Sequence, residues 1–170
     1  DSSDEEPPEC TLNETQIAEI KETIVGLKAE GNAFFGAKEY DSAIARYTEI
    51  IKLLKSNNLP ADDVILCNRS ATYMALARYV PASHDALMAT KANPDNWKAH
   101  WRHGVSILHM AKKKFRSKQA IQAFEDCLKC SSLPAAKREE ITRELGKAKS
   151  RLEQQDAETP MPDMSNCAPS

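Results

Sequence analysis

The chain has 170 residues, of which 41% are hydrophobic, 28% charged and 6% aromatic, and its formal net charge at pH 7 is −2. This length suits one domain of ordinary size with tails, and the near-neutral charge excludes a global field that would draw the protein to nucleic acid or to an acidic membrane. No apolar run approaches the roughly 20 residues of a membrane span and the N-terminus is acidic, so we expect a cytoplasmic protein, with the nucleus as a second location.

The expected helices follow from the spacing of apolar residues and from the capping and helix-breaking residues between them. The first ten residues, DSSDEEPPEC, are acidic and contain two prolines, which predicts a disordered arm. Thr11 and Glu14 have the spacing of a capping box, ahead of a first helix that runs to about Gly36. Apolar residues at helical spacing predict further helices at about 41–56, 63–76, 80–91, 95–112, 118–130 and 135–155. Residues 156–170 lack periodicity, which predicts a disordered tail or linker, and no segment shows strand alternation.

The predicted helices repeat. Aligning the chain with itself brings Gly31, Ser70 and Gly104 into one column and Ala43, Ala82 and Ala120 into another. A unit of about 34 residues, with insertions near 58–62 and 112–117, explains the spacing in both columns. An ordinary helical bundle with an accidental repeat is the alternative, but three units in register with all insertions in turns favour a repeat protein.

The segment LKAEGNAFFGAKEYDSAIARYTEIIKL resembles the first unit of a tetratricopeptide repeat (TPR) domain. Residues at about 24–57, 63–96 and 97–133 match three such units. The resemblance implies an all-α domain over 11–155, in which three helix-turn-helix repeats form a right-handed superhelix and a helix at about 135–155 caps the last repeat.

Five polar residues occupy the first helices of these units. They match the carboxylate clamp of chaperone-binding TPR domains: Lys28 and Asn32 as K-x-x-x-N, Asn68 in N-R-S, and Lys98 and Arg102 as K-x-x-x-R. The resemblance implies a co-chaperone adaptor that binds the C-terminal Glu-Glu-Val-Asp peptide of heat-shock protein 90, heat-shock protein 70 or both. The chemistry is consistent with this, because a terminal aspartate carries two carboxylates that need fixed cations and amide donors.

Four further residues follow the clamp positions along the same helix faces: Phe35, Ala71, Val105 and His109. They are candidates for a pocket that holds either the valine of the peptide or the residue upstream of its acidic pair. The alternative is that Phe35 and Val105 belong to the core between helices. His109 departs from the aromatic or apolar residue expected there, which leaves the choice between the two chaperones open.

Other functions find less support. Cys127 and Cys130 form an isolated CxxC and three histidines lie between positions 100 and 109, but neither pattern has the ligand spacing of a metal site. Trp97 and Trp101 are expected to pack between repeats. No catalytic motif is present, so we expect a monomeric, non-enzymatic protein without cofactor or metal. Two alternatives remain. One is a thiol or metal protein. The other is a TPR scaffold that recognises an unrelated internal peptide and serves as the targeting module of a larger prolyl isomerase, phosphatase or ubiquitin ligase.

Overall fold

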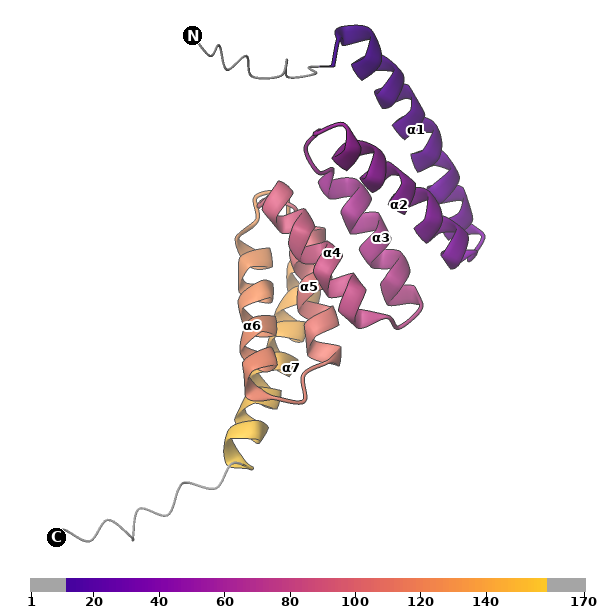
Figure 1. The fold of residues 1–170 in the computed structure, drawn as a ribbon. Coiled ribbons are helices and arrows are strands. Elements are labelled where there is room, and N and C mark those ends of the chain that lie inside the picture. Colours follow the sequence, from indigo (N-terminus) through magenta and orange to yellow (C-terminus); the bar gives the residue numbers. More distant parts are fainter. Residues whose placement is uncertain (1–11, 159–170) are drawn as a thin grey trace, which may run out of the picture. The chain divides into compact units, whose positions relative to one another are not determined.

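The computed structural model describes residues 12–158, and in this range it contains seven α-helices, one short 3₁₀ helix and no strand (Figure 1). The predicted all-α class is confirmed. The arm predicted at 1–10 lies outside the described residues, as does most of the tail predicted at 156–170. The helices are α1 (Glu14–Gly36), α2 (Tyr40–Ser56), α3 (Asp63–Ala75), α4 (Tyr79–Ala92), α5 (Trp97–His109), α6 (Lys114–Lys129), η1 (Ala135–Lys137) and α7 (Arg138–Ala157).

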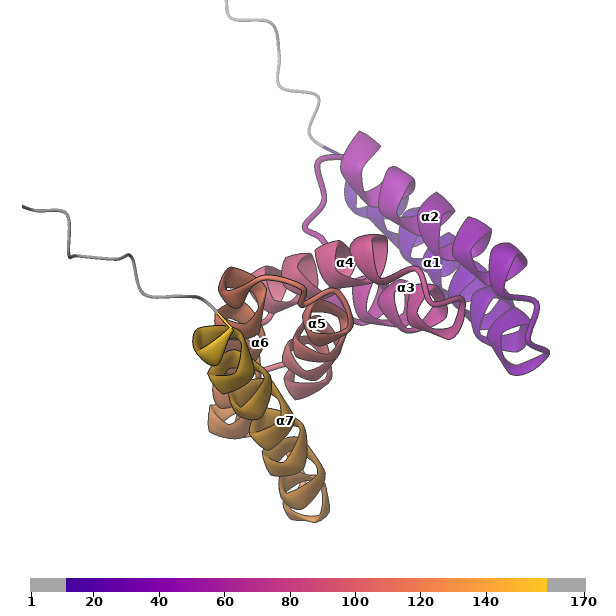
Figure 2. The ribbon, with the colours of Figure 1, turned by 90° about the horizontal axis from the view of Figure 1, so that it is seen from below.

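The chain divides into two compact units, one ending at Pro60 and the other beginning at Ala61. The first unit is the helical pair α1 and α2. In the second unit each helix from α3 to α7 packs on the next, and α5 also contacts both α3 and α7 (Figures 1 and 2). The odd-numbered helices of the second unit therefore form one layer, so side chains from α3 and α5 share a surface.

The first helix begins with a capping box, but not the predicted one. Its N-cap is Asn13, whose Oδ1 accepts a hydrogen bond from the Gln16 amide at 2.8 Å, while the Asn13 amide donates to Gln16 Oε1 at 3.0 Å. The prediction that Glu14 closes a box with Thr11 is wrong, because Glu14 is already the first residue of the helix. Asn is at least as strong an N-cap as Thr, so the better cap lies two residues further along.

The bounds of α5 and α6 also differ from those predicted. Helix α5 starts at Trp97 because Asn96 caps it, with Oδ1 accepting from the Ala99 amide at 3.1 Å. The expected first residue, Asp95, instead accepts hydrogen bonds from Ser131 after α6. Helix α6 begins at Lys114, four residues before the prediction, after a residue that offers no side-chain cap.

Two glycines of the repeat column have a packing role. A Cβ atom on Gly31 would lie 2.7 Å from the Tyr47 ring, and one on Gly104 would lie 2.8 Å from the Phe124 ring. Both rings belong to the second helix of the same repeat and are buried. The small residue therefore lets an aromatic ring pack directly on the backbone of the preceding helix.

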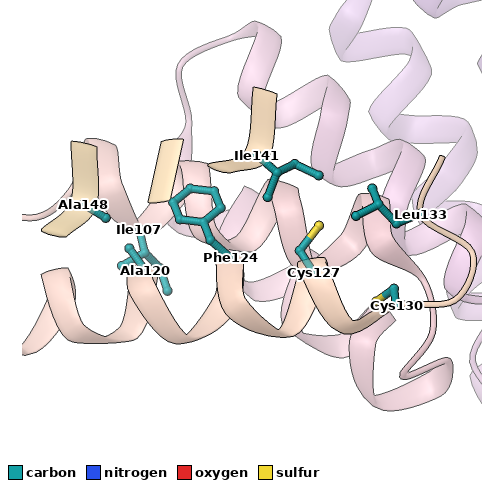
Figure 3. Packing of buried hydrophobic residues seen from close by; sticks show 8 residues of the cluster. All are labelled: Ile107, Ala120, Phe124, Cys127, Cys130, Leu133, Ile141 and Ala148. Atoms are coloured by element: carbon teal, nitrogen blue, oxygen red, sulfur yellow. The ribbon is translucent and has the colours of Figure 1, made fainter. Parts of the chain in front are cut away.

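The last helix covers the third repeat. Ile141 and Ala148 of α7 join a buried cluster with Phe124 and Cys127 of α6 and Ile107 of α5 (Figure 3). Trp97 and Trp101 are partly buried and pack against this cluster, so they pack within the third repeat and against the last helix, and not between repeats as predicted. Helix α7 thus removes from water an apolar surface that the third repeat does not bury itself.

Candidate functional site

Three of the five predicted clamp residues line one hollow in the second unit. Asn68 comes from α3, and Lys98 and Arg102 come from successive turns of α5. The hollow has a volume of about 310 Å³. Lys98 and Arg102 share a helix face because they are four residues apart, and the contact between α3 and α5 brings Asn68 to the same place.

The two cations keep their charge available. Among the described residues neither Lys98 nor Arg102 forms a salt bridge; Arg102 Nη1 donates to Cys67 Sγ, and the Lys98 ammonium lies 5.9 Å from the centre of the Trp97 ring. Burial raises the pKa of the Cys67 thiol, although Arg102 acts in the opposite direction. The thiol is therefore neutral at pH 7 and does not cancel the charge of the guanidinium.

Two acids also line the hollow, and both are already hydrogen-bonded. Asp63 Oδ2 accepts from Asn96 Nδ2 at 2.7 Å and from Asn93 Nδ2 at 3.1 Å. Since Asn96 caps α5, Asp63 joins the start of α3 to the start of α5. Hydrogen bonds from Ser131 and Ser132 hold the pKa of the second acid, Asp95, below its usual value.

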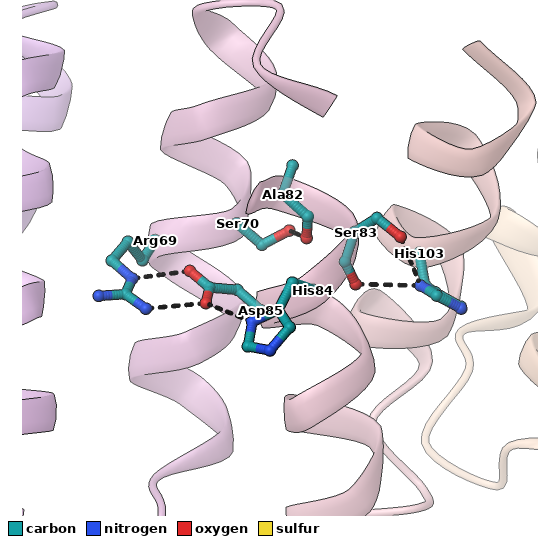
Figure 4. A network of polar contacts seen from close by, with 7 residues as sticks. All are labelled: Arg69, Ser70, Ala82, Ser83, His84, Asp85 and His103. Carbon is teal, nitrogen blue, oxygen red and sulfur yellow. Dashed lines mark hydrogen bonds and ion pairs between the residues drawn. The ribbon is translucent and has the colours of Figure 1, made fainter. Parts of the chain in front are cut away.

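The residues beside Asn68 fix its helix. Arg69 donates two hydrogen bonds to the buried Asp85 carboxylate of α4, from Nε at 2.7 Å and from Nη2 at 2.8 Å (Figure 4). Ser70 Oγ donates to the Ala82 carbonyl oxygen at 2.7 Å. Because both neighbours anchor α3 to α4, the side chain of Asn68 is held towards the hollow.

The other two predicted clamp residues, Lys28 and Asn32, lie on α1 in the first unit. They are four residues apart and therefore share a face. The Tyr47 hydroxyl donates to Asn32 Oδ1 at 2.7 Å, which orients the amide group. The same tyrosine packs on Gly31, so one residue of α2 both shapes the backbone and positions the amide.

The four candidates for an apolar pocket are placed differently. Phe35 is 39% exposed and its ring meets Tyr40 edge to face, with centroids 5.7 Å apart. Ala71 and Val105 are partly buried on α3 and α5, and the exposed His109 stacks on Tyr79 at 4.3 Å. None of the four lines the hollow that holds Asn68, Lys98 and Arg102.

Sequence reasoning missed Cys67, Asp63 and Asn96. Cys67 directly precedes Asn68, but its contact with Arg102 joins residues 35 positions apart, and the sequence contained no signal for it. Asp63 is visible in the sequence only as the first residue of a helix. Its bond to Asn96 spans 33 positions and appears only once α3 and α5 are packed together.

The isolated CxxC pair is buried in α6 and at its end. Cys127 Sγ donates to the Trp97 carbonyl oxygen at 3.2 Å, and burial raises the pKa of this thiol to about 12. The pKa of Cys130 is raised by burial as well. Residues 12–158 contain no group of three His, Cys, Asp or Glu side chains placed to hold a metal ion. Protonated, inaccessible thiols favour the packing role over a redox role.

No family model matches the chain. The heat-shock protein cognate co-chaperone sgt12 of Aspergillus fumigatus is 39% identical over 88 residues, which are 52% of this chain and 24% of that protein. The chain spans between 11% and 36% of the lengths of such curated relatives. None of the helices described in 12–158 is long and apolar enough to cross a membrane.

Solved structures agree in fold. The Sgt2 TPR domain from Aspergillus fumigatus aligns with a TM-score of 0.63 at 32% identity, covering 85% of this chain and 90% of that one. The first TPR domain of Spaghetti (RPAP3), solved with the HSP90 peptide SRMEEVD, aligns with a TM-score of 0.64 at 27% identity, covering 78% of this chain and 94% of that one.

Proposed function

Since this chain belongs to the tetratricopeptide repeat family, we propose that it is a non-catalytic co-chaperone module. Its ligand is the C-terminal Glu-Glu-Val-Asp peptide of cytosolic heat-shock protein 90 or heat-shock protein 70. The module therefore acts in the cytoplasm. The observation that carries the proposal is the hollow in which Asn68, Lys98 and Arg102 meet; neither cation forms a salt bridge within residues 12–158, and the two acids of the hollow, Asp63 and Asp95, are hydrogen-bonded to other groups.

The chemistry of the hollow suits a chain end. Arg102 and Lys98 supply charge for the two carboxylates of a terminal aspartate, and the Asn68 amide supplies a directional hydrogen bond. Each hydrogen bond to a charged group contributes about 1.5–3 kcal/mol. Ordering a flexible tail opposes this gain, so the expected affinity is micromolar, or about −8 kcal/mol.

In the proposal, Lys28 and Asn32 of α1 contact the same peptide. The support is their pattern, K-x-x-x-N, and the orientation that Tyr47 imposes on Asn32. Either alanine substitution is then expected to weaken peptide binding, because a carboxylate would lose one of its donors. An unchanged affinity in Lys28→Ala would restrict the site to the second unit.

Calorimetry with peptides tests the function. The wild-type protein is titrated with Ser-Arg-Met-Glu-Glu-Val-Asp as free acid and as C-terminal amide. We expect amidation, or Arg102→Ala, to weaken binding by at least about 2 kcal/mol, roughly 30-fold. Added salt should weaken binding of the free acid as well, since the contacts are ionic.

A matched pair of lysines separates the local effect from net charge. Lys98→Ala removes a cation from the hollow, whereas Lys91→Ala removes one from an exposed position in the last turn of α4. Only the first change should reduce affinity. Equal binding of acid and amide would reject the clamp and favour the alternative, a scaffold that recognises an internal peptide.

A further inference from the structure

The hollow that holds Asn68, Lys98 and Arg102, which we call the clamp hollow, is also lined by Ser132. This serine lies in the turn between α6 and η1 and is exposed. Lys129, three residues before it, supplies a cation of the kind that protein kinases use to recognise their substrates. A group attached to the Ser132 hydroxyl oxygen would therefore lie at the edge of the hollow, in a turn that an enzyme reaches from solvent.

Asp95 holds the turn in place. The Ser131 amide and hydroxyl donate to the two carboxylate oxygens of Asp95, at 2.6 and 2.7 Å, and the Ser132 amide donates to Asp95 Oδ2 at 3.1 Å. The Ser132 hydroxyl donates to the backbone carbonyl oxygen of Asp95. The two hydroxyls thus differ, because that of Ser131 faces a carboxylate, whereas that of Ser132 donates to the main chain and belongs to a residue that lines the clamp hollow.

The cations around this turn are unequally available to an anion on Ser132. Lys129 and Lys137, which flank the turn in the sequence, already lie 3.2 and 2.8 Å from carboxylates on their own helical segments. Lys98 and Arg102 form no salt bridge within residues 12–158. An anion attached to Ser132 is therefore attracted most strongly towards the clamp hollow.

A phosphate is the modification that this arrangement would redirect. It carries a charge of about −1.5 to −2 at pH 7 and replaces the hydroxyl proton, so Ser132 would lose its bond to the Asp95 carbonyl oxygen. Hydrogen bonds hold the pKa of the Asp95 carboxyl below its usual value, so this group is ionised at pH 7 and repels the phosphate. On the other side, Arg102 can bind phosphate through two nitrogens at once and Lys98 adds a second cation.

We propose that Ser132 is a phosphorylation site whose phosphate occupies the clamp hollow and excludes the carboxylates of the peptide. A protein kinase transfers the γ-phosphoryl group of a nucleoside triphosphate to Ser132 Oγ: the bond from this oxygen to the γ-phosphorus forms, the bond from the γ-phosphorus to the bridging oxygen breaks, and the diphosphate and the hydroxyl proton leave. The phosphate then takes the donors of Lys98 and Arg102 that a terminal aspartate would use. This assignment rests on the proposed function and adds a means of switching it off.

The first test is calorimetry on the full chain with phosphoserine installed at position 132 during translation. Its affinity for Ser-Arg-Met-Glu-Glu-Val-Asp should be at least about tenfold weaker than that of the unmodified chain, since charge-assisted hydrogen bonds to the peptide are lost. Unmodified Ser132→Ala should bind within about twofold of the wild type, because both cations stay available. The matched control is phosphoserine at position 131, which brings the same charge to the same turn but faces Asp95, and it should weaken binding by less than about threefold.

The second test needs no peptide. Phosphorus NMR follows the second pKa of the phosphate at position 132, which nearby cations should hold below its ordinary value of about 6. Lys98→Ala or Arg102→Ala should return this pKa towards 6, whereas the phosphate at position 131 should not respond to either change.

Three results would overturn the inference: unchanged peptide affinity with phosphoserine at position 132, an equal loss with phosphoserine at position 131, or a phosphorus titration that ignores Lys98→Ala and Arg102→Ala. The proposed function fails separately, if the unmodified chain binds the free acid and the amide of the peptide equally. In that case the phosphorus titration still tests whether the phosphate lies against Lys98 and Arg102.

Discussion

Gly104 of α5 and Gly146 of α7 lie in helices that contact each other, yet only one of them is forced to be glycine. A Cβ atom on Gly104 would meet Phe124 at 2.8 Å, and Phe124 is fully buried, so its ring has no space into which to move. A Cβ atom on Gly146 would have no neighbour within 4 Å. Close packing therefore requires glycine at position 104, whereas at position 146 glycine only lowers the stability of the helix.

Gly104→Ala is expected to destabilise the protein by about 1–3 kcal/mol, because the Phe124 ring must shift within a packed core. Gly146→Ala, as the matched control, should stabilise it by about 0.5–1 kcal/mol, since alanine loses less backbone entropy in a helix. Urea unfolding followed by circular dichroism measures both changes. Equal effects of the two substitutions would show that contact with Phe124 does not select the glycine.

At the scale of elements, the pair α3 and α4 is joined by one buried ion pair. The Arg69 side chain is 16% exposed and that of Asp85 is 3% exposed, and the guanidinium binds the carboxylate through two nitrogens. On the other side of α4, His103 Nδ1 of α5 lies 3.1 Å from both the carbonyl and the hydroxyl oxygen of Ser83 (Figure 4). Burial lowers the pKa of His103, so this contact is made by a neutral ring near pH 7.

Arg69→Met should cost about 3 kcal/mol of unfolding free energy, since it leaves the Asp85 carboxylate buried without its partner. Replacing both residues, as in Arg69→Met with Asp85→Leu, should recover most of this loss, because no buried charge remains. Chemical denaturation of the three proteins measures the difference. A double variant as unstable as the single one would mean that the pair contributes packing that these apolar residues do not reproduce.

At the scale of the whole molecule, the two units differ in the amount of buried core that each contains. The second unit has the cluster around Phe124 and Ile141 and five long helices. The first has a single helical pair, and Gly31 is the only buried residue of α1. A pair of helices buries too little apolar surface to be stable alone, so the second unit is expected to fold independently and the first is not.

A fragment of residues 61–170 should therefore unfold cooperatively and retain helical circular dichroism. Its affinity for Ser-Arg-Met-Glu-Glu-Val-Asp should be at least about tenfold weaker than that of the full chain, because the two donors proposed on α1 are missing. Circular dichroism and calorimetry give the two readouts. Full affinity in the fragment would show that Lys28 and Asn32 do not contribute to binding.

Local pattern determined most of the helices. Their interiors are set by apolar spacing and by short-range capping, which act over a few residues and can be read directly. The helix ends were predicted less accurately. Asn13, and not Thr11, caps α1, and Asp95 does not begin α5 but accepts hydrogen bonds from Ser131, after α6. Such competition is decided by which partner a capping side chain finds, and that partner can lie far away in the sequence.

The sequence by itself determined the repeat, the helical class and the five candidate positions of the clamp, because each is a matter of residue type at a fixed spacing. Only the tertiary structure decided what surrounds them. The bond between Asp63 and Asn96, the contact of Arg102 with Cys67, and the hollow shared by Asn68 and Lys98 all join residues from different helices. The physical reason is that hydrogen bonds and cavities depend on distances of a few ångströms across helix interfaces, which packing sets and which periodicity along one helix does not contain.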